Sequence, residues 1–172
     1  MEQTVAIRLL EKGIEKTSRA VWADLGAGSG VFTKALATLL GESNMVYAVD
    51  KDEAALQFNL HRDLLNIKTI TADFNKDELN LPPLDGILMA NSLHYIKSKL
   101  SFVTKLKEML KPQGRLVIVE YDTLAANTWV PYPIDFKSLT KLMGEAGFSS
   151  VIKLGEEPSR FRQGSIYSAL VQ

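Results

Sequence analysis

Short apolar runs alternate with amphipathic segments along most of this chain, and the alternation restricts the folds open to it. Five runs are rich in aliphatic and β-branched residues and are bounded by turn residues, so they predict strands. These are Ala20–Leu25, Met45–Asp50, Ile67–Ala72, Leu84–Ala90 and Arg115–Tyr121. Because the runs are almost continuously apolar, we expect both faces of these strands to be covered, as in a mostly parallel sheet.

The segments between the runs have helical spacing. The predicted helices are Thr4–Lys16, Gly30–Leu40, Asp52–Leu65, Ser98–Leu110 and Ser138–Ala146. Gly41 and Gly147 are well placed to end two of them. Strand–helix alternation of this kind predicts an open α/β sheet with right-handed crossovers and helices on both faces.

The end of the chain departs from this pattern. Phe148–Leu154 and Ser165–Val171 read as strands, but only Gly155–Gly164 separates them. That gap is too short for a crossover helix, so we expect the two strands to pair antiparallel. The predicted fold is a doubly wound α/β sheet of seven strands with the last strand antiparallel.

Composition narrows the class of protein. The 172 residues suit one domain, and we see no repeat or linker, so residues 1–172 are predicted to form one unit. Without cysteine there is no disulfide framework or thiol nucleophile, and with two histidines a His/Cys metal site is not expected. Twenty basic residues balance twenty acidic ones, which argues against a nucleic-acid coat protein.

The sequence also indicates where the protein works. No apolar run approaches the ~18 residues of a membrane span, so no membrane span is expected. Glu2 and Arg8 lie where a signal peptide would be apolar. We therefore expect a cytoplasmic protein.

The segment Asp24–Gly30, DLGAGSG, follows the first predicted strand and opens a helix. Ligands of open α/β sheets bind at the carboxyl ends of the strands. Glycines there let the backbone approach a ligand closely, and the N–H groups of the helix start attract an anionic group. A tight turn without a ligand is the alternative. Three glycines at every second position, after an acid, favour a ligand site.

The spacing of these glycines separates the families of nucleotide-binding loops. A dinucleotide fingerprint needs glycine where Val31 stands, and no Gly-Lys-Ser/Thr follows as a Walker loop requires. The pattern Asp-x-Gly-x-Gly-x-Gly instead resembles the first motif of the class I S-adenosylmethionine-dependent methyltransferases. The resemblance runs from Val21 to the end of the chain and implies a Rossmann-like fold with S-adenosylmethionine as cofactor.

The resemblance also assigns cofactor-binding residues. Asp50 ends the second strand and would accept bonds from both ribose hydroxyls, although Asp50 with Glu53 also fits a helix capping box. Asp73 would meet the adenine amine, or form an Asx turn instead. The implied cofactor-binding residues are Asp24, Gly26, Ala27, Gly28, Gly30, Asp50, Lys51, Asp73, Phe74 and Asn91.

Two of these residues carry further expectations. Asn91 is expected to contact the amino group of the cofactor. Asp24 would attract the positive charges of the cofactor, directly or through water, or would hold the loop by accepting backbone N–H bonds. We expect Asp24 to combine both roles.

The predicted catalytic residues are His94, Tyr95 and Tyr121, at the ends of the fourth and fifth strands. Histidine titrates near neutral pH and suits a general base, although His94 could also be hydrogen-bonded within a loop. Glu120 could line the acceptor pocket or face solvent. His61 falls in a predicted helix and is interpreted as a surface residue.

The acceptor is constrained only in part. The Asn-Pro-Pro-Tyr type sequence of methyltransferases acting on adenine or glutamine is absent after the fourth strand. The Leu-His-Tyr at 93–95 and the Leu-Lys-Pro-Gln-Gly-Arg-Leu at 110–116 resemble small-molecule methyltransferases, including the ubiquinone/menaquinone biosynthesis type. An aromatic loop around Trp129 and Tyr132 and a helix within residues 1–19 remain to cover the active site.

Lysines form one basic run, which predicts a solvated helix face or a patch for an anionic substrate. The run consists of Lys97, Lys99, Lys105, Lys107 and Lys111.

The predicted function is therefore transfer of a methyl group from S-adenosylmethionine to a small organic acceptor by direct displacement. A protein or nucleic-acid methyltransferase is one alternative, and a non-catalytic cofactor-binding assembly partner is another. No nucleic-acid partner is expected, and a homodimer stays open. The sequence does not specify the acceptor, the atom that is methylated or the need for a general base.

Overall fold

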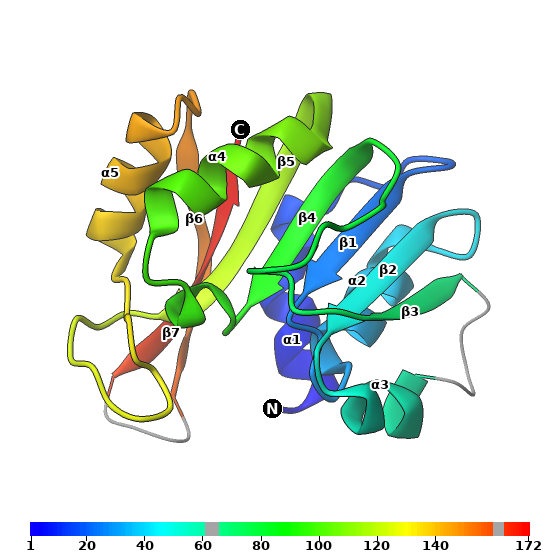
Figure 1. Cartoon of the computed structure of the whole chain (residues 1–172), viewed down its shortest axis with the longest axis horizontal. Helices are drawn as coiled ribbons and strands as arrows, with labels where there is room; N and C mark the ends of the chain where they lie inside the picture. Colours follow the sequence, from blue (N-terminus) through cyan, green and yellow to red (C-terminus); the bar gives the residue numbers. More distant parts are fainter. Residues whose placement is uncertain (61–65, 160–163) are drawn as a thin grey trace.

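A computed structural model describes residues 1–60, 66–159 and 164–172, and its centre is a seven-stranded sheet (Figure 1). The strands are β1 (Val21–Leu25), β2 (Met45–Asp50), β3 (Ile67–Thr71), β4 (Leu84–Ala90), β5 (Leu110–Tyr121), β6 (Val151–Pro158) and β7 (Ser165–Val171). Their order across the sheet is β3-β2-β1-β4-β5-β7-β6.

The direction of the last strand confirms the sequence prediction. The pairs β3·β2, β2·β1, β1·β4 and β4·β5 are parallel, whereas β7 runs antiparallel to both β5 and β6. The antiparallel strand is not at the edge, because β7 lies between β5 and β6 and leaves β6 outermost. The strand order reverses at β1, so a crevice at its carboxyl end is the expected ligand position.

Helices cover both faces of the sheet (Figure 1). They are α1 (Gln3–Leu10), the 3₁₀ turn η1 (Glu11–Gly13), α2 (Val31–Leu40), α3 (Glu53–Leu60), the 3₁₀ turn η2 (Leu93–Tyr95), α4 (Lys99–Met109) and α5 (Phe136–Glu145). Helices α1 and α2 pack on one face, and α4 and α5 on the other. Leu56 of α3 packs on Ala48 of β2. Ala48 lies two residues after Val46, so both side chains point to the face of the sheet that α1 and α2 cover.

Several predicted helices have other limits than the observed ones, and one of them, predicted over Ser138–Ala146, is seen as α5 at Phe136–Glu145. The helix predicted to Lys16 ends at Leu10 and tightens into η1, which ends at Gly13. A Cβ atom at Gly13 would lie 2.6 Å from Leu154 Cδ1, so a side chain there would have to displace the Leu154 side chain of β6. The helix predicted over Asp52–Leu65 is seen as α3, and residues 61–65, with His61, lie outside the described residues.

Two strands also begin elsewhere than predicted. Strand β5 starts at Leu110 and not at Arg115. In the pairing of β4 with β5, Leu84 lies opposite Leu110 and Gly86 lies opposite Arg115. Residues 111–114 therefore form an irregular, bulge-like insertion in β5. The sequence predicted the end of a helix at Leu110 and the start of this strand only at Arg115. Strand β6 spans Val151–Pro158 and extends into the segment predicted to connect the last two strands.

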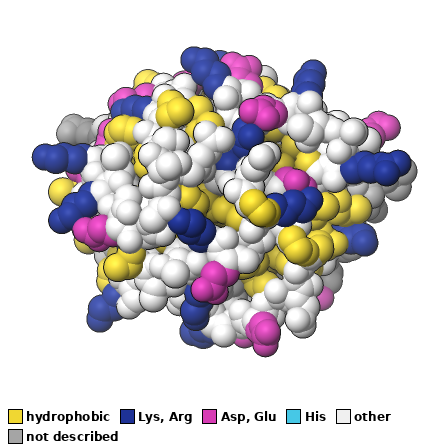
Figure 2. Space-filling view, turned by 90° about the horizontal axis from the view of Figure 1, so that it is seen from above, with side chains coloured by type: hydrophobic (Ala, Val, Ile, Leu, Met, Phe, Trp, Pro, Cys, Tyr) yellow, Lys and Arg dark blue, Asp and Glu magenta, His cyan; other side chains and the backbone are white. Residues whose placement is uncertain are grey.

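The face of the molecule drawn in Figure 2 agrees with the balanced composition. In Figure 2 the side chains of Lys and Arg are interspersed with those of Asp and Glu, without a continuous patch of one sign. None of the helices in the described part of the chain is both long and apolar enough to span a membrane.

Candidate active site

The glycine loop between β1 and α2 adopts a conformation that side chains disfavour. Gly26, Gly28 and Gly30 have φ angles of 88°, 49° and 75°. A Cβ atom at Gly26 would also lie 2.5 Å from Ser92 Cβ. Glycine is therefore required at position 26 by both backbone conformation and space.

Hydrogen bonds that the loop donates to strand β2 hold the loop in place. The N–H groups of Gly26 and Ala27 donate to Val49 O at 2.8 and 3.1 Å. Gly28 N–H donates to Asp50 Oδ2 at 2.8 Å, and Asp52 N–H donates to Asp50 Oδ1 at 2.9 Å. The Asp50 carboxylate thus joins the glycine loop to the start of α3.

The capping box given as the alternative role of Asp50 is not formed. Asp52 immediately precedes α3, and its Oδ1 accepts a hydrogen bond from Ala55 N–H at 3.1 Å. That is the bond an N-cap residue makes with the third residue of its helix. Asp50 is consequently not the residue that caps α3.

Asp24 is buried beneath the glycine loop. Its Oδ2 accepts a hydrogen bond from Thr33 Oγ1 at 2.6 Å, so the carboxylate contacts the first turn of α2 and not a loop N–H. Its Oδ1 has no hydrogen-bond partner among the described residues. Burial raises the pKa of Asp24 to about 7, the Thr33 hydroxyl opposes the shift, and the nearby charge of Asp50 adds to it.

A cavity of about 220 Å³ opens beside the loop. Its walls come from the glycine loop, the start of α2, the ends of β4 and β5, β7 and the first residue. They are Met1, Gly26, Ala27, Gly28, Ser29, Val31, Phe32, Ala90, Asn91, Tyr121 and Ile166. The predicted loop residues 26–28 therefore share one cavity with Asn91 and the predicted catalytic residue Tyr121.

Asn91 contributes a second buried oxygen without a partner. Its backbone has a φ of 54°, and its N–H donates to Val119 O at 2.8 Å. Its Oδ1 has no hydrogen-bond partner among the described residues, like Asp24 Oδ1. A ligand that carries positive charge and N–H donors would satisfy such acceptors. The ammonium and sulfonium of S-adenosylmethionine fit this description.

The remaining predicted cofactor residues follow strands β2 and β3. Asp73 Oδ1 accepts from Asn75 N–H at 3.1 Å, so the Asx turn given as the alternative is formed. Phe74 Cε1 lies 3.3 Å from the position of a Cβ at Gly26, so the Phe74 ring borders the loop. Lys51 is exposed beside Asp50.

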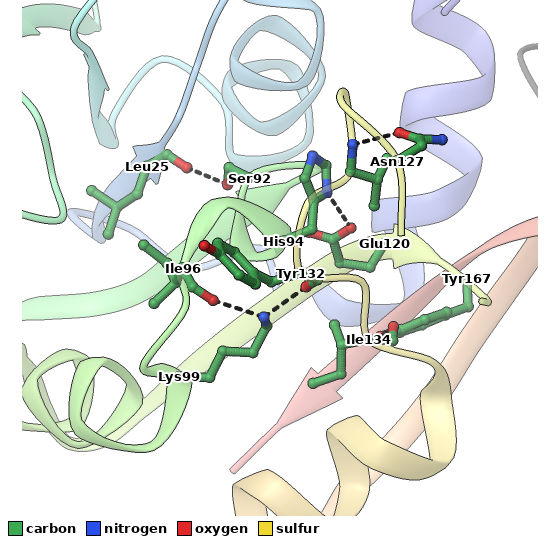
Figure 3. A network of polar contacts seen from close by, with 11 residues as sticks. Leu25, Ser92, His94, Ile96, Lys99, Glu120, Asn127, Tyr132, Ile134 and Tyr167 are labelled. Atoms are coloured by element: carbon green, nitrogen blue, oxygen red, sulfur yellow. Dashed lines mark hydrogen bonds and ion pairs between the residues drawn. The ribbon is translucent and has the colours of Figure 1, made fainter. Parts of the chain in front are cut away.

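His94 and Glu120 form a buried pair next to this region (Figure 3). His94 is 2% exposed and Glu120 is 1% exposed. His94 Nδ1 lies 2.7 Å from Glu120 Oε2, and His94 N–H donates to Glu120 Oε1 at 3.0 Å. Because a carboxylate only accepts hydrogen bonds, this contact assigns a ring proton to Nδ1, and in the neutral form of the imidazole Nε2 then carries the lone pair.

The three predicted catalytic side chains are neighbours. The ring centroid of His94 lies 4.4 Å from that of Tyr95 and 6.1 Å from that of Tyr121. Tyr121 links the histidine to the cavity because it also lines the cavity wall. Burial raises the pKa of Tyr95, and the charges of Glu120 and Asp50 add to the shift, so its phenol stays neutral at physiological pH.

The sequence did not identify several residues that shape the candidate site. It left open whether Glu120 faces solvent, and the burial of Glu120 rules this out. Ser92 Oγ donates to Leu25 O at 2.6 Å and ties the end of β4 to the glycine loop. Thr33 was visible only as a hydroxyl three residues after the last glycine of the loop.

The basic run is also not uniformly solvated. Lys99 Nζ donates to Ile96 O and Tyr132 O, at 2.7 and 2.6 Å. Lys111 Nζ pairs with Asp85 Oδ2 at 2.7 Å. Within residues 1–60, 66–159 and 164–172, no three acidic or histidine side chains gather as a metal site would require.

Comparison with known proteins decides the family. A family model described as a methyltransferase domain matches residues 16–155. This chain belongs to that methyltransferase family. The match confirms the class I S-adenosylmethionine-dependent methyltransferase that the glycine motif predicted, and the Rossmann-like sheet agrees with it.

Relatives of several kinds share this domain. A highly reducing polyketide synthase from Penicillium polonicum is 30% identical over 105 residues, which are 56% of this chain and 4% of that protein. A ubiquinone/menaquinone biosynthesis C-methyltransferase from Burkholderia mallei is 29% identical over 112 residues, 63% of this chain and 44% of that protein. The aligned region thus covers less than half of either relative.

A solved structure shows the same fold. The Burkholderia thailandensis 1,6-didemethyltoxoflavin-N1-methyltransferase, with 1,6-didemethyltoxoflavin and S-adenosylhomocysteine bound, superposes with a TM-score of 0.74 at 19% identity. The superposition covers 98% of this chain and 76% of that one.

Proposed function

We propose that this methyltransferase transfers a methyl group to a small organic acceptor that must first lose a proton, with His94 as the general base. The observation that carries the proposal is the buried His94–Glu120 pair, held beside the cavity that Tyr121 and the glycine loop line. An acceptor carbon, hydroxyl or ring nitrogen bearing a proton meets this description.

The residues around the cavity suit S-adenosylmethionine. The unpartnered Oδ1 of Asn91, on the cavity wall, would face its positive groups, and Asp24 would act on them from beneath the glycine loop. Asp50 would accept from the ribose hydroxyls. Phe74, which borders the glycine loop, and Asp73 would meet the adenine. Once bound, the cofactor supplies a methyl group attached to a sulfonium. After transfer of this methyl group, the remainder of the cofactor is a neutral thioether.

His94 and Glu120 have distinct roles in this proposal. His94 Nε2 takes the proton from the acceptor, while Glu120 holds the imidazole through Nδ1 and stabilises the imidazolium that forms. Glu120 also fixes the backbone of His94 through its N–H. Because both side chains are buried, little reorganisation of water accompanies the proton transfer.

The comparisons support a small acceptor without naming it. One relative is named a C-methyltransferase of ubiquinone/menaquinone biosynthesis, and a structural neighbour is named an N1-methyltransferase of 1,6-didemethyltoxoflavin. In both classes an acceptor proton has to be removed. We therefore propose a small-molecule carbon or nitrogen acceptor.

Cofactor binding is tested by thermal unfolding. At a ligand concentration 100 times the dissociation constant, linkage predicts about 2.7 kcal/mol of stabilisation. For a chain of this length that corresponds to a midpoint shift of several degrees with S-adenosylhomocysteine. A nicotinamide dinucleotide serves as control and should give no shift. A shift with the dinucleotide alone would contradict the proposal.

The base is tested with the variants His94→Gln and Glu120→Gln. Release of S-adenosylhomocysteine is measured across a panel of phenols, quinols and nitrogen heterocycles. We expect His94→Gln to bind S-adenosylhomocysteine normally and to slow transfer by about 10² to 10⁴-fold. Transfer at the wild-type rate by His94→Gln would refute the assignment of the base.

A further inference from the structure

The burial of His94 raises the question of how an acceptor reaches it. The segment between β5 and α5, residues 122–135 and here called the covering loop, runs beside His94 (Figure 3). Tyr132 N–H in this loop donates to His94 O at 3.0 Å. An acceptor that approaches His94 from the side of Tyr132 therefore meets the covering loop.

The base and the tip of the covering loop are fixed independently of His94. Phe136 N–H donates to Asp122 Oδ1 at 3.0 Å and closes the base of the loop. Tyr167 Oη donates to Ile134 O at 3.0 Å and fastens the same end to β7. At the tip, Asn127 Oδ1 accepts from the N–H groups of residues 129 and 130, at 2.9 and 2.8 Å. Such a loop can move as a unit about its closed base.

One side chain fastens the middle of the loop to the element that carries His94. Lys99 Nζ donates to Tyr132 O at 2.6 Å and to Ile96 O at 2.7 Å. Its ammonium also lies 5.6 Å from the centroid of the Tyr132 ring. Both backbone groups of Tyr132 are thus bonded to the segment 94–99, the N–H to His94 and the carbonyl to Lys99.

From this geometry we propose that Lys99 is a positioning residue, which holds the covering loop closed over His94 and whose release opens the path of the acceptor. The inference rests on the proposed function, since access matters only where His94 is the base. Release by Lys99 leaves one of the two backbone bonds that join Tyr132 to the segment 94–99, from Tyr132 N–H to His94 O, while the bonds at Asp122 and Ile134 keep the base of the loop in place.

The contact between Lys99 and the covering loop is charge-assisted. Hydrogen bonds from an ammonium are charge-assisted and stronger than neutral ones. Burial lowers the pKa of Lys99, whereas the charge of Glu120 acts in the opposite direction. Loss of one such bond typically changes an opening equilibrium by about tenfold or more.

The experiment compares Lys99→Met, which keeps the stem and removes the ammonium, with Lys99→Arg, which keeps the charge and the donors. Lys105→Met on the exposed face of α4 is the matched control. Hydrogen exchange is followed by mass spectrometry on peptides that cover residues 122–135. Modification of His94 by diethyl pyrocarbonate is followed on the same samples.

We expect Lys99→Met to raise both the exchange rate of the covering loop and the modification rate of His94 by about tenfold. Lys99→Arg should restore most of the protection, and Lys105→Met should behave as wild type. Unchanged protection of His94 in Lys99→Met would overturn the proposal. Protection lost equally in Lys99→Arg would also overturn it, because a bonded cation would then not be what holds the loop.

A second variant separates the ring of Tyr132 from its backbone. Tyr132→Ala removes the ring beside the ammonium but keeps the N–H and carbonyl that bond to His94 and Lys99. We expect Tyr132→Ala to retain most of the protection of the covering loop and of His94. If protection were lost as fully as in Lys99→Met, the Tyr132 ring would be what keeps the loop closed, and the role of the carbonyl would be refuted. None of these measurements needs methyl transfer, so they succeed or fail independently of the proposed function.

Discussion

Replacement of Asp24 by asparagine should make the protein more stable at alkaline pH while weakening cofactor binding. In the folded chain burial raises the pKa of Asp24 from 3.8 to about 7. The unfolded chain ionises this carboxyl near its ordinary pKa. Between the two values the folded state holds one proton more than the unfolded state. The free energy of unfolding therefore falls by about 1.4 kcal/mol per pH unit as the pH rises through this window.

The magnitude follows from the width of the window. A pKa shift of about three units corresponds to a penalty of about 4 kcal/mol, which is complete above pH 7. Asparagine cannot ionise and escapes the penalty, while Thr33 can still donate to its amide oxygen. The new amide N–H₂ in place of the unpartnered Oδ1 costs about 1 to 3 kcal/mol, but this cost does not depend on pH.

The assay is urea unfolding of wild type and Asp24→Asn at a series of pH values. The stability of Asp24→Asn relative to wild type should increase by about 3 kcal/mol between pH 4.5 and pH 8.5. Groups that titrate in both proteins cancel in this difference. A difference that does not vary with pH would show that Asp24 is not held as a buried, partly protonated acid, and the reasoning would fail.

Three further predictions concern other parts of the molecule. Gly26→Ala should destabilise the fold by about 1 to 3 kcal/mol in urea unfolding and abolish the shift with S-adenosylhomocysteine, because its φ is 88° and its Cβ would meet Ser92. Glu120→Gln should lower kcat more than it raises KM, since the amide holds His94 less firmly and no longer stabilises its charged form. Asp135→Ala should cost about 1 kcal/mol at neutral pH through loss of the α5 N-cap. Because the bond to Ser138 lowers the pKa of Asp135, that loss should shrink as the pH falls through the acidic range, in thermal unfolding.

The elements that the sequence predicted well are those whose signal is local. Strands β1, β2, β4 and β7 are apolar runs bounded by turn residues, and they appear within one residue of the predicted limits. The glycine loop was also predictable, because positive φ angles require residues without a side chain. By contrast, β5 was predicted five residues too short, since Pro112 and Gly114 resemble a turn unless the bulge is known.

What the sequence could not show depends on contacts between distant residues. Glu120 is 26 residues from His94, and Lys99 is 33 residues from Tyr132. Nothing in the local pattern of Lys99 distinguishes it from the other lysines of the basic run, because its partners are backbone carbonyls. The position of β7 between β5 and β6 likewise follows from sheet pairing and not from periodicity.

The bond from Gly28 N–H to Asp50 Oδ2 has a consequence for the rate and entropy of ligand capture. Because this bond forms within the protein alone, the chain loses the conformational freedom of the glycine loop when it folds and not when it meets a ligand. A receptor whose contact surface is ordered beforehand loses less entropy on complex formation and needs no slow rearrangement first. Titration calorimetry of S-adenosylhomocysteine should therefore report a small entropic cost, and stopped-flow mixing a single second-order phase.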